Sequence, residues 1–312
     1  MPVSDAQATV SPTAQPSAVL PARLAGRTLA PTKPRGPLRA VWRQFRRSKT
    51  SLAGVVLLAL LVGGAVFAPV FAPYESDQQS RDAREAPSRD HLLGTDTFGR
   101  DIFSRILYGG RLSLTVGIIS VGIGLTLGTL LGLLGGYVGK WVDGLVGIFT
   151  DVMLAFPSIL LAMAIIAILG RSLTNVMIAV GIASIPAYIR LVRSSVIAAK
   201  NLPYVEAAQV IGCGGGRVML KHLLPNVIGP VTVLATLSIA TAILTAAGLS
   251  FLGLGAQPPT PEWGAMVSDG RQYLRSYWWF VTMPGIAIMF TVLAINLIGD
   301  GLRDAIDPRL RR

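Results

Sequence analysis

Residues 112–134 read LSLTVGIISVGIGLTLGTLLGLL, a run of 23 positions without a charged side chain. A helix needs about 20 mainly apolar residues to cross the hydrocarbon of a bilayer, so this stretch predicts a transmembrane helix. Small residues recur in and just beyond it at every fourth position: Ser120, Gly124, Gly128, Gly132 and Gly136. Because small side chains let helix backbones approach closely in lipid, we interpret this stripe as a packing surface for a crossing helix.

Five more apolar stretches of similar length flank this one: Leu52–Ala72, Val152–Leu169, Leu173–Ile189, Ile228–Leu254 and Trp279–Ile298. The chain is 52% hydrophobic and 14% charged, whereas soluble domains carry about 25% charged residues. We therefore predict an all-α integral membrane protein with six transmembrane helices. Only Gly170, Arg171 and Ser172 separate the third span from the fourth, which predicts a tight helical hairpin.

The segments outside the spans define the expected organisation of the chain. Residues 1–37 are rich in Ala, Pro, Ser and Thr and are expected to form a disordered cytoplasmic tail. Residues 38–72 combine a basic flank with the first transmembrane helix, and residues 73–111 form an outer loop with a short helix. Residues 112–312 form a five-helix transmembrane core with a long cytoplasmic loop at 190–227.

The basic residues predict the orientation of the chain. With both termini in the cytoplasm, 19 of the 28 Lys and Arg residues lie on the cytoplasmic side, as the positive-inside rule requires. Six of the other nine lie in the outer loop, residues 73–111. The net charge of +12 is spread over segments that flank apolar spans rather than gathered on one soluble face, so no nucleic-acid partner is expected.

Several chemistries are missing from the sequence. We expect no catalytic residue, no phosphate-binding loop and no cofactor bound by this chain. Cys213 is the only cysteine, so no intramolecular disulfide can form. His91 and His222 fall on opposite sides of the membrane in this topology, so no shared metal site is expected. The spans also lack the mid-membrane ionisable groups of proton- or sodium-driven carriers, so the energy for any transport would come from outside the chain.

The longest cytoplasmic loop contains Lys200–Ile228, which reads KNLPYVEAAQVIGCGGGRVMLKHLLPNVI. A first short helix is expected at 203–211, where a proline occupies the first turn and Gly212 ends the helix. A second short helix is expected at 217–224, ending before Pro225. The sequence therefore predicts a helix–turn–helix arm on the inner membrane surface.

The first helix of this arm has two expected faces. Val205, Ala208 and Ile211 are assigned to one side by the helical period. The small side chains of Ala207 and Ala208 would let another protein pack closely against the arm.

The arm resembles the EAA loop of permease subunits of ABC importers, whose pattern is E-A-A, three residues, G, nine residues, then I-x-L-P. The matching positions are Glu206, Ala207, Ala208, Gly212, Leu224 and Pro225. His222 stands where the general pattern has Ile, which is similar to the peptide-importing branch. The chain departs from the pattern at 213–216, where it is richer in glycine.

Two further segments are similar to the C-type permease subunit of dipeptide and oligopeptide ABC importers: HLLGTDTFGRDIFSRILYGGRLSL at 91–114, and the region from LSFLGLGAQPPTPEWGAM to IDPRLR at 249–311. With the arm, the resemblance extends from about Arg39 onward. It implies a type I importer fold in the bacterial inner membrane. It also implies four kinds of partner: a second permease, two ATPase subunits that carry ATP and Mg²⁺, an external solute-binding protein and membrane lipid.

In that family the arm is the coupling helix that docks into a groove of the ATPase subunit. The residues that the resemblance assigns to this contact are Tyr204, Glu206, Ala207, Ala208, Gly212, Cys213, Arg217, His222 and Pro225. Dipeptides and oligopeptides are the expected solutes, with nickel chelates, haem or oligosaccharides as alternatives. An ATPase-independent channel or carrier, and a scaffold without transport, are the alternatives of another class.

Two outer segments carry further hypotheses. The charged residues of 96–105 are expected to pair on an exposed surface helix, where such pairs contribute little energy. Glu262 and Trp263 either contact the external binding protein or belong to a self-packed outer cap.

Overall fold

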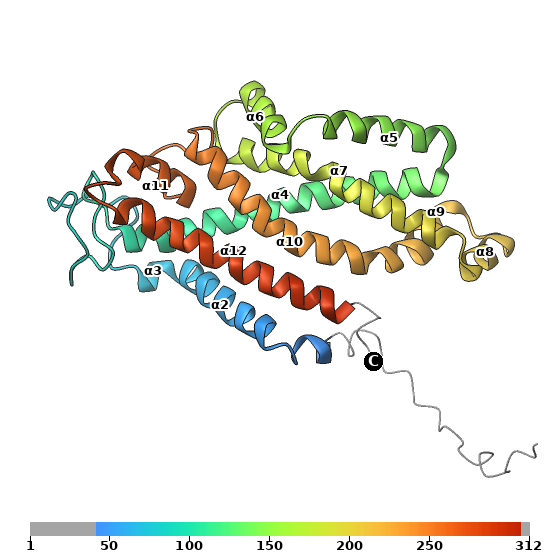
Figure 1. Cartoon of the computed structure of the whole chain (residues 1–312), viewed down its shortest axis with the longest axis horizontal. Coiled ribbons are helices and arrows are strands. Elements are labelled where there is room, and N and C mark those ends of the chain that lie inside the picture. Colours follow the sequence, from blue (N-terminus) through green and yellow to red (C-terminus); the bar gives the residue numbers. More distant parts are fainter. Residues whose placement is uncertain (1–41, 307–312) are drawn as a thin grey trace, which may run out of the picture. The chain divides into compact units, whose positions relative to one another are not determined.

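The computed structural model describes residues 42–306, and within them the chain is helical and contains no strand. Its elements are α2 (Lys49–Val66), α3 (Ala68–Phe71), α4 (Ile102–Val138), α5 (Lys140–Leu154), α6 (Ser158–Leu169), α7 (Leu173–Lys200), α8 (Pro203–Val210), α9 (Gly215–Arg217), the π-helical turn η1 (Val218–Leu223), α10 (Leu224–Phe251), α11 (Trp263–Gly270), the 3₁₀ turn η2 (Arg271–Tyr273) and α12 (Trp279–Ile306) (Figure 1). The predicted tail at 1–37 lies outside the described residues.

Five helical stretches are long and apolar enough to cross a membrane: α2, α4, α7, α12 and the run Gly215–Phe251 that ends with α10. The predicted third span is not one straight helix, because α5 and α6 meet at 90°. The break falls just before Ser158, where Pro157 adopts an extended conformation. Proline disfavours helical backbone in the residue before it, and α6 alone rises only about 18 Å. Six spans result when the bent pair counts as one, which confirms the predicted number, and the third span is broken rather than one continuous helix.

The glycine stripe of α4 packs against α7, and these two helices lie side by side (Figure 1). A Cβ built on Gly128 would lie 2.4 Å from Tyr188 Cβ. A Cβ on Gly132 would lie 2.8 Å from Val192 Cβ. Both distances are too short for any side chain larger than hydrogen, so the predicted packing surface is confirmed.

The hairpin between α6 and α7 is also confirmed. Gly170 ends α6 with φ +93°, and Ser172 caps α7 by accepting a hydrogen bond from the Asn175 N–H at 3.1 Å. Asn175 Nδ2 donates in turn to the carbonyls of Leu169 and Gly170, each at 2.9 Å. These bonds satisfy carbonyls at the end of α6 that have no partner within the helix.

The longest helix, α4, connects two functional regions. Its 37 residues rise about 55 Å, well beyond the hydrocarbon core of about 30 Å. The outer loop precedes its first residue, and the segment α8–η1 lies beside its last turns (Figure 1). A Cβ on Gly215 would meet the Tyr137 ring at 3.1 Å, which fixes this contact. The loop and the arm therefore lie at opposite ends of α4.

Candidate functional site

The arm, residues 202–225, is anchored to the bundle by one side of α8. Val205 and Ala208 are buried, and Val205 packs with Val218 and Leu223 in a cluster that continues into α7 and α10. These two residues are three positions apart and so share a helix face. The burial of Ala208 corrects the expectation that its small side chain is available to another protein, because it faces the arm's own bundle.

A Schellman motif ends α8. Gly212 has φ +85°, its N–H donates to the Gln209 carbonyl at 3.0 Å, and the Cys213 N–H donates to the Ala208 carbonyl at 3.0 Å. This cap needs a left-handed residue directly after the helix, and glycine adopts that conformation without strain. The spacing between the two alanines and Gly212 is therefore explained by one short helix and its cap.

The second half of the arm differs from the expectation. A separate helix ending before Pro225 was predicted, but α9 continues through η1 into α10 without a break. Within η1 the Leu224 N–H donates to the Met219 carbonyl, five residues back. Pro225, which has no backbone N–H, is the second residue of α10 and lies directly after this π-helical turn, so the helical run continues through it.

The predicted contact residues divide by exposure. The exposed ones are Tyr204, Glu206, Ala207, Gly212, Arg217 and Pro225, while Cys213 and His222 are half-buried. Tyr204 and His222 are held by one side chain, because Asn226 Nδ2 donates to Tyr204 Oη at 2.8 Å and to the His222 carbonyl at 2.7 Å. This amide joins α8 to the start of α10.

Three apolar residues on the arm were missed. Val210 is 86% exposed, Ile211 79% and Leu220 63%. Ile211 was expected to face inward with Val205, but α8 ends at Val210 and Ile211 leaves the helical path. The helical period could have identified Val210, since five residues place it about 140° from Val205. Exposed apolar side chains that lie close together are typical of a surface that contacts another protein or a membrane.

A second candidate region is a cavity of about 270 Å³ between α4, the α5–α6 bend, α7 and α10. Most of its lining surface is apolar, but six lining residues carry a hydroxyl group: Ser120, Ser158, Ser184, Ser238, Thr241 and Thr245. Among the described residues that line this cavity, none is charged. Leu154 and Ser158 stand on either side of the bend, so the break in the third span helps to shape the cavity.

A larger hollow of about 530 Å³ continues from this cavity along α7 and α10. The two share Leu154, Pro186 and Ala187. Arg190 and Arg303 line the larger hollow, toward the end of the bundle that carries the arm. The two hollows together form one furrow, and we use this name for the residues that line either of them. The furrow runs from the Ser and Thr residues of the first cavity to Arg190 and Arg303 at its basic end.

The outer cap buries both residues that were candidates for a binding-protein contact. Glu262 and Trp263 are each 2% exposed. The Glu262 carboxylate caps α11 by accepting from the N–H groups of Gly264 and Ala265 at 2.9 Å. Trp263 Nε1 donates to the Ile106 carbonyl at 3.0 Å. The direct-contact hypothesis is therefore wrong, and the self-packed cap is confirmed.

The charged residues of 96–105 do pair, but not on an exposed helix. Arg100 Nε lies 2.6 Å from Asp96 Oδ2, and Arg105 is buried with hydrogen bonds to the Ser76 and Pro259 carbonyls. Arg105 therefore ties the outer loop to the segment before α11, and burial strengthens these hydrogen bonds. Burial also raises the pKa of the nearby Asp269 carboxyl, while the Arg100 and Arg105 charges oppose that shift.

Residues 124–312, which include the arm and nearly all of the furrow, match the family described as the binding-protein-dependent transport system inner membrane component. The chain belongs to this family. Residues 36–87 of this permease match the N-terminal transmembrane domain of oligopeptide transport permease C. The resemblance to the C-type subunit of peptide importers is thereby confirmed, and the protein is a multi-pass inner-membrane permease subunit of an ABC importer.

Curated relatives cover most of the permease. The dipeptide transport system permease protein DppC of Alkalihalophilus pseudofirmus is 49% identical over 88% of this chain and 91% of its own length. The di/tripeptide permease DppC of Pseudomonas aeruginosa is 49% identical over 88% of this chain and 93% of its own. The glutathione permease GsiD of Pectobacterium atrosepticum is 46% identical over 89% and 93%.

A solved structure supports the fold alone. A chain of the MetNI methionine ABC transporter, in an inward-facing conformation, aligns with a TM-score of 0.52 at 20% identity. The alignment covers 65% of this permease and 96% of that chain. The type I importer fold that the sequence predicts is therefore confirmed.

Proposed function

We propose that this permease forms half of a heterodimeric ABC importer for dipeptides and oligopeptides, with a second permease, two ATPase subunits and an external solute-binding protein. The observation that carries the proposal is the arm. It is a short capped helix, anchored on one side and apolar on the other, at one end of the bundle. ATP and Mg²⁺ are bound by the ATPase partners, and this chain contributes transport without catalysis.

The arm suits a coupling role because its two sides are separate. Val205 and Ala208 connect it rigidly to α7 and α10, which border the furrow. Val210 and Ile211 are free to enter a groove of the ATPase. Movement of that groove on ATP binding would then shift the walls of the furrow, provided that the arm contacts the ATPase differently in its two states.

The furrow suits peptides as the solute. Serine and threonine hydroxyls donate and accept hydrogen bonds, so they can follow a peptide backbone whatever its side chains. The first cavity has no charged lining residue, so this part of the path does not select for the charge of the solute. Selectivity among peptides would then come from the external binding protein, and the named relatives act on dipeptides, di/tripeptides and glutathione.

The proposed orientation places both termini and the arm in the cytoplasm, and Cys213 tests it. This thiol is the only one in the chain and is half-buried in the arm. We expect a membrane-impermeant maleimide to label it in inside-out vesicles stripped of peripheral subunits, and not in intact spheroplasts. A variant with Cys213→Ser and Ala86→Cys, which moves the thiol to the outer loop, should label in the opposite way. Labelling of Cys213 from outside would reverse the topology.

Ala207→Glu tests the proposed function. Ala207 is exposed on α8, so a glutamate there leaves the permease folded and places a charge in the ATPase groove, where an unpaired buried charge is costly. We expect the ATPase subunits no longer to co-purify in mild detergent. With ATP inside the proteoliposomes and the binding protein outside, we also expect ATP-driven uptake of labelled dialanine to fall at least tenfold.

The matched control is Ala86→Glu, the same change at an exposed position of the outer loop; it should keep both the ATPase and the uptake. Uptake that persists in Ala207→Glu would favour an ATPase-independent carrier or channel. If the ATPase co-purifies with the wild type but a nickel chelate, haem or an oligosaccharide is transported in place of peptides, the coupling stands and the solute class is wrong.

A further inference from the structure

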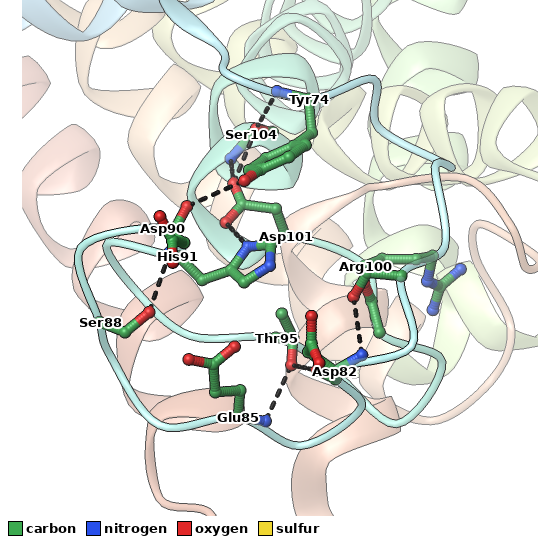
Figure 2. Close-up of polar contacts among 12 residues, drawn as sticks. Tyr74, Asp82, Glu85, Ser88, Asp90, His91, Thr95, Arg100, Asp101 and Ser104 are labelled. Atoms are coloured by element: carbon green, nitrogen blue, oxygen red, sulfur yellow. Dashed lines mark hydrogen bonds and ion pairs between the residues drawn. The ribbon is translucent and has the colours of Figure 1, made fainter.

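Three side chains of the outer loop converge on one point that transport does not use. The carboxylates of Asp82 and Glu85 and a ring nitrogen of His91 lie within 4.8 Å of one another. Figure 2 shows His91 between Asp101 on one side and the two acidic residues on the other. The spacing of Asp82, Glu85 and His91 matches no regular metal-binding motif, so these residues come together only through the fold of the loop.

The Asp101 carboxylate orients the imidazole of His91 through its Nδ1 side. The residue is 4% exposed, and its Nδ1 lies 3.0 Å from Asp101 Oδ1. The other oxygen of that carboxylate accepts from both the N–H and the hydroxyl of Ser104 at 2.7 Å. An ionised carboxylate only accepts, so Nδ1 is the donor of this hydrogen bond, and in the neutral ring Nε2 presents a lone pair. Among residues 42–306, nothing forms a hydrogen bond with Nε2.

This arrangement is that of a metal ligand. Histidines that bind metals nearly always donate their second ring N–H to a carboxylate or carbonyl, which fixes both the tautomer and the ring direction. The Tyr74 ring also lies against the imidazole, with centroids 4.8 Å apart. A buried imidazole held on two sides has only its Nε2 direction left for a ligand.

The two carboxylates are available to the same point. Two other acids nearby are already paired, Asp96 with Arg100 and Asp101 with His91. The side chains of Asp82 and Glu85 make no hydrogen bond or ion pair with any residue that the structure describes. Their backbones are nevertheless fixed by buried Thr95, whose hydroxyl donates to the Asp82 carbonyl and accepts from the Glu85 N–H, the latter at 2.9 Å.

We infer that Asp82, Glu85 and His91 bind a first-row divalent cation such as Zn²⁺. One imidazole and two carboxylates are ligands that Zn²⁺ takes at about 2.0–2.2 Å, so tetrahedral ligand atoms lie about 3.4 Å apart. Asp82 is exposed and Glu85 half-buried, which leaves both free to close the remaining gap, and water takes the fourth position. The bound ion joins residues 82–91 to the capped start of α4 through His91 and Asp101, and so stiffens the outer surface.

The experiment uses the full-length chain in the assembled transporter, purified through a tag that does not bind metals. After equilibrium dialysis against Zn²⁺, elemental analysis should find one ion per permease that is missing from the Asp82→Asn, Glu85→Gln double variant. Each single variant should bind at least about tenfold more weakly, since even the loss of an outer-shell partner costs about 10–100-fold. Co²⁺ at the same site should give visible absorption bands that excess Zn²⁺ removes.

Asp90→Asn is the matched control. It removes the same charge from an exposed position next to His91 without removing a ligand, so its Zn²⁺ binding should equal that of the wild type. Equal Zn²⁺ content in the wild type and the double variant would overturn the inference. An equal loss of Zn²⁺ binding in Asp90→Asn would also overturn it, because the effect would then come from the net charge of the loop. Displacement of Zn²⁺ by equimolar Mg²⁺ would also overturn it, because hard oxygen-seeking cations do not select an imidazole.

Discussion

Gly212→Pro is expected to abolish solute uptake while the chain still inserts into the membrane at the abundance of the wild type. Gly212 has φ +85°, and its N–H closes the Schellman motif on the Gln209 carbonyl. Proline fixes φ near −65° and has no N–H, so the helix can no longer end where it does. Val210 and Ile211 would then leave the positions from which we propose that they contact the ATPase groove. ATP-driven uptake of labelled dialanine, with permease abundance measured on immunoblots, provides the test.

Two neighbouring substitutions sharpen this test. Gly214→Pro is the matched control, because Gly214 already has φ −61°, which proline adopts; uptake should persist. Gly212→Ala should be intermediate, since a Cβ there meets nothing within 4 Å and only the left-handed backbone costs about 1–2 kcal/mol. Normal uptake in Gly212→Pro, or an equal loss of uptake in both proline variants, would show that the helix cap at Gly212 is not what coupling requires.

Local patterns account for what the sequence could predict. The six spans follow from apolar length, the packing stripe from the spacing of Gly124, Gly128 and Gly132, and the arm from a short helix ended by Gly212. Each signal depends on residues within a few turns of one another. The physical cause of each pattern lies in neighbouring residues, so the sequence is enough to predict it, and the structure agrees.

The bend in the third span shows where a local signal fails. Pro157 separates α5 from α6 at 90°, yet α7, α10 and α12 continue past Pro186, Pro230 and Pro284. The same residue type breaks one span and leaves three intact. The packing of neighbouring helices decides the outcome, since it can hold a helix together where a backbone hydrogen bond is missing. Sequence alone does not contain that packing.

The sequence could not assign Glu262 and Trp263 to the outer cap for a related reason. Trp263 donates to Ile106, 157 residues earlier, and Glu262 approaches Ser113, 149 residues earlier. A glutamate followed by a tryptophan in a loop suits either a contact surface or a buried cap. Only the return of α11 onto the start of α4 distinguishes them. The same return buries Arg105, whose charge had indicated a surface position.

The second large effect concerns the interface on which the whole bundle depends. We expect Gly128→Leu to prevent the folded permease from accumulating. A Cβ at this position already lies 2.4 Å from Tyr188 Cβ and 2.9 Å from the Ile185 carbonyl. Since one neighbour is backbone, no rotamer change can make room, and α4 must separate from α7. Overpacking of this kind costs about 1–3 kcal/mol even where side chains can yield, against a total stability of about 5–15 kcal/mol.

Gly122→Leu is the control within the same helix, because a Cβ on Gly122 meets nothing within 4 Å. Fluorescence-detected gel filtration in mild detergent should give a single wild-type peak for Gly122→Leu and aggregate or no peak for Gly128→Leu. Thermal melts of the surviving material should rank the two in the same order. If both variants melt together, the close approach of α4 and α7 does not hold the bundle. The walls of the furrow would then depend on the second permease for their stability, because no other helix pair in residues 42–306 makes as extensive a contact as these two.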